Sequence, residues 1–225
     1  MITLTTTWHP RGEMPRLQRF YPLLKEMYQH TMVVLPPAVE PALAKSVESL
    51  GMRVVIPEDW SWGRFLALRK ALETDSDLIH YVDLDRLLRW VETRPEEWRQ
   101  AIVTISDADC VCFGRTLAAY ATHPKALLET EASSNRVISH LLGRQMDVSA
   151  GSKGFKRQAA EFLDKHTVPG ASMGMDAAWL VLLNRAGYRI KYVEVDGLDW
   201  ESADQFRMEA ADAETQRQAR AAYDA

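Results

Sequence analysis

Two aspartates, Asp83 and Asp85, stand one residue apart directly after the apolar run 78–82. Where a buried strand leaves the core, two such carboxylates can project toward a divalent cation. Mg²⁺ and Mn²⁺ are hard cations that are commonly held by one or two carboxylates, while substrate phosphates fill other coordination positions. The pattern predicts a Mg²⁺ or Mn²⁺ site at Asp85 and Asp83. The structural alternative is that Asp83 caps a following helix and Asp85 is a solvated loop residue.

The first part of the chain alternates short apolar strands with amphipathic helices. Apolar spacing predicts strands at 2–7, 31–35, 52–56 and 78–82, and helices at 17–30, 38–50 and 64–73. This alternation is typical of parallel βαβ units in an open α/β sheet. In such sheets, ligands bind outside the carboxyl ends of the strands. Asp83, Asp85 and the loop after Thr7 are all expected at such ends.

The second part of the chain is less regular. Helices are expected at 95–100, 124–143, 157–165 and 175–186, and strands at 109–114 and 188–195. The glycine-containing segment 146–155 is predicted to be a loop with strand at one edge. Residues 1–201 are predicted to form a single domain, followed by a polar helix or tail at 202–225 that has few large apolar residues.

Composition excludes several classes of protein. The chain has 225 residues, a formal charge of −4 and a pI of about 5.9, which give no general attraction to nucleic acid. The N-terminal residues do not form a signal peptide, and no apolar run approaches the roughly 20 residues that span a bilayer. A cytoplasmic protein is therefore expected, with peripheral membrane contact left open. Neither the Walker phosphate loop nor the Gly-x-Gly-x-x-Gly fingerprint is present.

The order of the motifs resembles the GT-A glycosyltransferases, especially family 2 and its polyprenyl-phosphate sugar transferase branch. The resemblance covers most of the chain up to about residue 200, and the order of its short motifs is more specific than any one motif. It rests on the helix 63–72, the strand and Asp-x-Asp at 77–85, the strand ending in an arginine at 109–115, and the segment 147–157. That last segment resembles Asp-x-x-Ser-Gly-Phe-Lys with an insertion, and 174–179 falls where the family keeps an acidic residue.

The resemblance implies a GT-A (nucleotide-diphospho-sugar transferase) fold, with an open, mixed but mostly parallel sheet flanked by helices. It further implies metal-dependent transfer of a sugar from a nucleotide-sugar donor to a hydroxyl acceptor, with inversion at the anomeric carbon. In this reading Asp85 binds the metal, and Asp83 lies near the metal or the donor ribose. Asp176 is the candidate general base for the acceptor hydroxyl. Its structural alternative is a carboxylate favoured at a helix N-terminus.

Further residues are candidates to bind the substrate. Four cationic side chains could clamp phosphate: Arg115, Lys153, Lys156 and Arg157. A solvated basic loop is the alternative for the last three. Trp8 and His9 follow the first strand and are candidates to contact the donor, although a surface position is the alternative for His9.

Some residues have a structural expectation instead. His80 lies inside a strand and is expected to be a buried, hydrogen-bonded residue. Arg64 and Arg69 are five positions apart and do not share a helix face, so one of them is expected at the surface. Trp60 and Trp62 are expected to pack against the core, with stacking on a base or sugar as the alternative.

The sequence also departs from the family pattern. The first strand runs into Thr7-Trp8-His9-Pro10, where a Pro-x-Tyr-Asn-type loop is usual, and the second strand lacks the usual acidic residue at its end. Two other functions therefore stay open. One is a non-catalytic GT-A-like module that binds a sugar nucleotide or a partner. The other is a nucleotidyltransferase, which would want a glycine-rich basic loop after the first strand.

Overall fold

A computed structural model describes residues 1–168 and 172–200 of the chain. These residues form a seven-stranded sheet in the order β3-β2-β1-β4-β6-β5-β7. The strands are β1 (Ile2–Thr7), β2 (His30–Val34), β3 (Arg53–Val55), β4 (Leu78–Asp83), β5 (Cys110–Arg115), β6 (Ser152–Lys156) and β7 (Ile190–Val195). All pairings are parallel except those of β6, which is antiparallel to both β4 and β5. The prediction of an open, mixed but mostly parallel sheet is confirmed.

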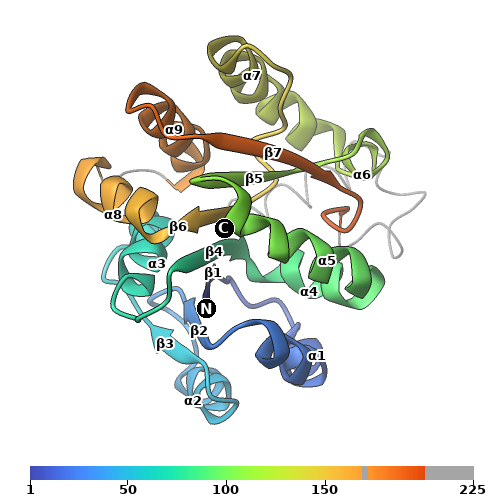
Figure 1. The fold of residues 1–225 in the computed structure, drawn as a ribbon. Helices are drawn as coiled ribbons and strands as arrows, with labels where there is room; N and C mark the ends of the chain where they lie inside the picture. The colour runs from blue at the N-terminus through green and yellow to red at the C-terminus, as the bar shows by residue number, and fades with distance from the viewer. Residues whose placement is uncertain (169–171, 201–225) are drawn as a thin grey trace.

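Helices cover both faces of the sheet (Figure 1). The α-helices are α1 (Met14–Met27), α2 (Pro41–Ser49), α3 (Gly63–Ala71), α4 (Leu84–Thr93), α5 (Pro95–Val103), α6 (Leu117–Ala121), α7 (Lys125–Leu142), α8 (Arg157–His166) and α9 (Ser172–Arg185). Two short 3₁₀ helices, η1 (Trp60–Trp62) and η2 (Thr104–Asp107), precede α3 and β5. The expected tail at 202–225 lies outside the described residues, and the domain boundary at 201 stays a prediction.

Each face of the sheet has its own apolar core. Side chains of α1, α2, α4 and α5 pack on one face around strand residues such as Leu4, Val33 and Val82. Side chains of α3, α7, α8 and α9 pack on the other around Ile79, Tyr81 and others. Strand side chains alternate between faces, so neighbouring residues of β4 serve different cores. The two cores hold β4 in the middle of the sheet, with its last residue, Asp83, at the carboxyl edge.

The segment expected to be mainly a loop contains a central strand. β6 lies between β4 and β5, with Val82 opposite Ser152 and Leu78 opposite Lys156. A Cβ on Gly154 would come within 2.4 Å of the Ile105 side chain, so the glycine lets β6 pack closely against η2. Weak apolar periodicity concealed this strand because Ser152 and Gly154 carry little apolar surface. Its antiparallel direction decides which of its residues lie near Asp83.

His80 is buried and hydrogen-bonded, as expected. The Trp98 indole donates to the Tyr28 hydroxyl at 3.3 Å, and that hydroxyl lies 2.7 Å from His80 Nδ1. His80 Nε2 lies 2.9 Å from Ser152 Oγ on the other side. Burial lowers the pKa of His80 to about 3, so the ring is neutral. We infer that Tyr28 donates to Nδ1 and that Nε2 carries the proton.

Candidate functional site

The carboxyl ends of β1 and β4 meet at one edge of the sheet. Thr7, the last residue of β1, is paired with Asp83, the last residue of β4. β4 passes directly into α4, so Asp85 lies in the first turn of that helix. The parallel pairing therefore brings together the two carboxylates and the loop after Thr7, as the sequence predicts. This edge is the place where open α/β sheets bind ligands.

Both carboxylate oxygens of Asp83 have donors. Its Oδ1 accepts from Thr7 Oγ1 at 3.0 Å and from the Tyr81 hydroxyl at 2.6 Å. Its Oδ2 accepts from Arg64 Nη2 at 2.8 Å. The side chain makes no capping hydrogen bond to α4, so the capping alternative is wrong. Gly151 fits closely behind it, because a Cβ there would lie 2.5 Å from Asp83 Oδ2. The carboxylate is held in one orientation.

Asp85 has far fewer partners. Among the described residues it accepts one hydrogen bond, from the backbone N–H of Arg86 at 2.9 Å. Burial raises the pKa of the Asp85 carboxyl, and the negative charges of Asp83 and Glu13 raise it further, while Arg86 opposes the shift. A carboxylate among like charges gains most from a cation. Its free oxygen lone pairs therefore fit a divalent metal.

The protein by itself supplies few metal ligands. Within the described ranges, no three His, Cys, Asp or Glu side chains are grouped to hold an ion. A cation bound by Asp85 and Asp83 would complete its shell with water and ligand oxygens. Mg²⁺ commonly binds in this way, through one or two carboxylates plus substrate phosphates.

A buried ion-pair network links Asp83 to Asp176. Arg64, at the start of α3, donates from Nη2 to Asp83 and from Nη1 to Asp176 Oδ2. Lys153 Nζ donates to Asp176 Oδ1 at 2.6 Å and to the Val148 carbonyl at 3.0 Å. All the charged side chains of this network are largely buried, and Lys153 has no exposed surface. Asp176 is thus brought to the site, but with two cations already bound to it.

Lys153 is not a phosphate-binding loop residue. It lies on β6, and its side chain points into the core that contains Tyr81 and Cys112. Burial lowers the pKa of its ammonium group. The expectation that it clamps phosphate is corrected, because its side chain is enclosed and both of its described hydrogen-bond partners are protein oxygens.

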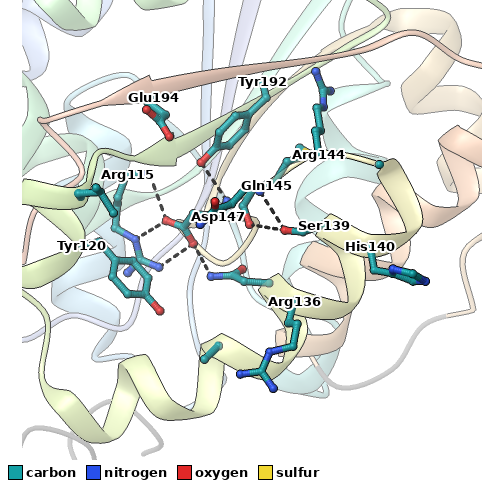
Figure 2. Close-up of a pocket in the computed structure, with 15 residues that line it drawn as sticks. Arg115, Tyr120, Arg136, Ser139, His140, Arg144, Gln145, Asp147, Tyr192 and Glu194 are labelled. Atoms are coloured by element: carbon teal, nitrogen blue, oxygen red, sulfur yellow. Dashed lines mark hydrogen bonds and ion pairs between the residues drawn. The ribbon is translucent and has the colours of Figure 1, made fainter.

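Arg115 is also committed to internal partners. It lies at the end of β5 with its side chain 1% exposed, and its Nε donates to Asp147 Oδ2 at 2.6 Å (Figure 2). Its Nη2 donates to Asp147 Oδ1 at 2.9 Å and to Glu131 Oε2 at 2.5 Å. The expected phosphate contact of Arg115 is therefore corrected: its guanidinium group holds the segment before β6 in place. The sequence did not show this, because Glu131 and Asp147 are far from Arg115 along the chain.

Lys156 and Arg157 lie at the opposite edge of the sheet. Lys156 pairs with Leu78, the first residue of β4, because β6 runs antiparallel. Its Nζ lies 3.7 Å from Asp109 Oδ1. Arg157 donates to the carbonyls of Ser76, Leu72 and Thr74. The expected phosphate clamp from these two residues is wrong, because a full strand length separates them from Asp83.

The two residues after β1 have different environments. Trp8 is 3% exposed and its indole donates to Glu13 Oε2 at 3.2 Å, so it packs inside the loop and not on an open surface. His9 is exposed, and its ring centroid lies 6.4 Å from that of Trp60. Trp62 is 49% exposed, contrary to the expected core packing. His9 and Trp62 therefore remain available at the surface.

Arg64 is the main site residue that the sequence did not single out. One of Arg64 and Arg69 was expected at the surface, and it is Arg69, whose side chain is 51% exposed. Arg64 follows Gly63 directly at the start of α3, near the end of β1. Its place in a helix next to the expected site was a usable signal. Its bridging of two carboxylates depends on contacts that only the folded chain makes.

Comparison with known proteins gives a fold and no family. No protein-family model matches the chain, and no curated protein matches it in sequence. The glucosyl-3-phosphoglycerate synthase from Mycobacterium tuberculosis, solved with Mn²⁺, UDP and phosphoglyceric acid, superimposes with a TM-score of 0.57 at 16% identity, over 86% of this chain and 68% of that one. The mannosyl-3-phosphoglycerate synthase from Rubrobacter xylanophilus gives 0.54 at 15% identity, over 87% and 64%.

A nucleotidyltransferase-type neighbour covers more of both chains. The 4-diphosphocytidyl-2C-methyl-D-erythritol synthase from Anaerococcus prevotii gives a TM-score of 0.55 at 11% identity, over 96% of this chain and 98% of that one. Identities this low establish the fold alone. No described helix is both long and apolar enough to cross a membrane. The chain has the GT-A, or nucleotide-diphospho-sugar transferase, fold.

Proposed function

We propose that this protein is a divalent-metal-dependent glycosyltransferase that moves a sugar from a nucleotide-diphosphate donor to a hydroxyl acceptor. The observation that carries the proposal is the pair of carboxylates at the joined ends of β1 and β4. Asp83 is fixed by three donors, whereas Asp85 beside it has one backbone partner among the described residues. A fixed carboxylate next to an open one, with Arg64 adjacent, suits a metal-bound diphosphate.

The metal would be Mg²⁺ or Mn²⁺, held by Asp85 with Asp83 beside it. When bound, it supplies Lewis-acid stabilisation of the charge that develops on the leaving diphosphate. The Mycobacterium tuberculosis synthase with this fold was solved with Mn²⁺ and UDP, which supports the same ligand class here. His9 and Trp62, which are exposed near the same edge, are offered as contacts for the donor.

Asp176 is proposed as the general base that takes the proton of the acceptor hydroxyl. A carboxylate paired with two cations is a weak base, because the positive charges stabilise its ionised form. The proposal therefore requires Arg64 to turn from Asp176 toward the donor diphosphate, while Lys153 keeps Asp176 in place. A single in-line displacement would then invert the anomeric carbon. The polyprenyl-phosphate branch remains our proposal for the subgroup.

A second function, a non-catalytic module that binds a sugar nucleotide, is favoured by one observation. Asp176 is 5% exposed and ion-paired with both Arg64 and Lys153. If Arg64 never releases it, Asp176 serves only to hold α9 against β6. Such a protein would bind metal and nucleotide at Asp83 and Asp85 without turnover.

Thermal unfolding with UDP, GDP and their sugars, with and without Mn²⁺, tests the binding part. A ligand at about 100 times its Kd stabilises a protein by about 2.7 kcal/mol, which corresponds to roughly 5–10 °C in Tm for a domain of this size. We expect this shift only when metal and nucleotide are both present. It should vanish in Asp85→Asn and persist in Asp77→Asn, an exposed carboxylate at the other end of β4.

Turnover then separates the two functions. Hydrolysis of the stabilising sugar nucleotide should be detectable in the wild type and lost in Asp176→Asn, measured at a temperature where that variant is folded. Binding without hydrolysis or transfer would favour the non-catalytic module. If no nucleotide shifts Tm in the presence of Mn²⁺, both functions are wrong for these donors.

A further inference from the structure

A pocket lies between α7 and the strands β5 and β7, and neither proposed function uses it. Its volume is about 700 Å³, within the range of roughly 300–1,000 Å³ typical of small-molecule sites. Figure 2 shows Tyr192 on β7 directed toward Asp147 in the middle of the pocket, with Arg144 on one side and Arg136 on the other. The walls combine the rings of Tyr120 and Tyr192 with cationic and polar groups.

The lining has more hydrogen-bond donors than free acceptors. Asp147 is a pocket carboxylate, but its oxygens already accept from Arg115 and from the Asn135 amide at 2.9 Å. Arg136 and Arg144 make no ion pair in the described part of the chain, and Arg144 donates to the Ile190 carbonyl at 2.7 Å. Both guanidinium groups carry N–H donors beyond those contacts.

Tyr192 adds a neutral donor beside Asp147. Its hydroxyl oxygen accepts from the backbone N–H of Asp147 at 2.9 Å. Burial raises the pKa of Tyr192 to about 12, so the hydroxyl keeps its hydrogen near neutral pH. Within residues 1–168 and 172–200, that hydrogen has no acceptor. An oxygen of a bound ligand would provide one.

The charge of the lining also favours an anion. Arg115 makes a bidentate contact with Asp147 and a further ion pair with Glu131, which lies outside the lining. Of the remaining formally charged side chains in the pocket, Arg136 and Arg144 are positive and Glu194 is negative. Counted over the lining side chains alone, with Asp147 set against Arg115 and His140 counted as neutral, the excess is one positive charge. Guanidinium groups and a hydroxyl suit an oxyanion, and the two tyrosine rings suit a flat or apolar body.

We propose that this pocket binds a small molecule that carries a phosphate or carboxylate oxyanion on a ring-shaped or apolar body. The oxyanion accepts a hydrogen bond from the Tyr192 hydroxyl, the positive charges of Arg136 and Arg144 on the two sides of the pocket attract it, and the body lies against the Tyr120 and Tyr192 rings. Asp147 connects the pocket to the buried network, because the next residue, Val148, accepts from Lys153. The proposal stands independently of the glycosyltransferase function.

Isothermal titration calorimetry with phenyl phosphate tests the site, with inorganic phosphate, benzoate and phenol as partial probes at constant ionic strength. We expect phenyl phosphate to bind more tightly than inorganic phosphate or phenol. The variant Arg136→Gln/Arg144→Gln should weaken it by about tenfold or more, since it removes both positive charges that attract the anion. Arg185→Gln, an exposed arginine of α9 outside the pocket, should bind as the wild type does.

Two comparisons locate the bound probe. Tyr192→Phe keeps the ring and removes the donor, so phenyl phosphate should weaken while phenol does not. Saturating UDP and Mn²⁺ should leave the binding of phenyl phosphate unchanged. Displacement by UDP would assign the probe to the donor site and overturn the proposal. The proposal is equally wrong if no anionic probe binds, or if the double arginine variant binds phenyl phosphate with unchanged Kd.

Discussion

Replacing Asp176 with asparagine should destabilise the protein strongly. Lys153 has no exposed surface, and its described partners are Asp176 Oδ1 at 2.6 Å and the Val148 carbonyl. Removing the carboxylate charge leaves an uncompensated buried ammonium group, which typically costs roughly 3–5 kcal/mol. Arg64 adds less to this cost, because Asp83 still neutralises it at 2.8 Å.

Lys153→Met should cost less than Asp176→Asn. It removes the buried cation, whereas Asp176 keeps its ion pair with Arg64. The expected loss is about 1–3 kcal/mol for the hydrogen-bonding capacity left unsatisfied. The double variant Lys153→Met/Asp176→Asn contains neither charge, so its loss should fall short of the sum of the single losses by roughly 1–3 kcal/mol.

Urea unfolding followed by tryptophan fluorescence measures these free energies, provided that the m values of the variants agree. The matched control is the pair Arg69 and Asp164, which join α3 to α8 at 2.7 Å with side chains 51% and 29% exposed. Its coupling energy should be about 0–1 kcal/mol. Additive losses within about 0.5 kcal/mol for Lys153 and Asp176 would refute the argument. So would an Asp176→Asn loss smaller than that of Lys153→Met.

Asp85→Asn should leave the free energy of unfolding in urea unchanged or slightly raised, because burial and neighbouring carboxylates raise the pKa of Asp85. The same variant should abolish metal-dependent nucleotide binding in calorimetry. A large loss of stability would contradict this prediction. Gly151→Ala should lower the free energy of unfolding by about 1–3 kcal/mol, since φ is +71° and the new Cβ would meet Asp83 Oδ2. It should also weaken Mn²⁺-dependent nucleotide binding. An unchanged urea midpoint and metal affinity would contradict this, because they would mean that the backbone around Gly151 adjusts to the new side chain. The wild type should lose stability as pH falls from 7.5 to 5, because His80 has a folded pKa of about 3 and an unfolded value of 6.5, so only the unfolded state takes up the proton. The His80 share at pH 5 is about 2 kcal/mol, and a His80→Gln variant with the same pH slope in urea unfolding would argue against it.

Much of the fold could be read from local patterns. The apolar runs at 2–7 and 78–82 and the intervening helical periodicities predict parallel strands, and parallel strands end at a common edge. The placement of Asp83 and Asp85 follows directly from this. The pattern failed at 152–156, because a central strand that contains serine and glycine lacks the apolar alternation by which strands are found.

The sequence by itself thus determined an α/β sheet with two carboxylates at its carboxyl edge, because strand and helix periodicities are local properties. The tertiary structure decided what the basic residues do. The antiparallel pairing of β6 sends Lys156 to the far edge, turns Lys153 into the core, and leaves Asp176 within reach of Lys153. Arg64 and Asp176 are 112 residues apart and meet only in the folded chain. Strand direction and such long-range ion pairs depend on the packing of the whole chain, which no local spacing encodes.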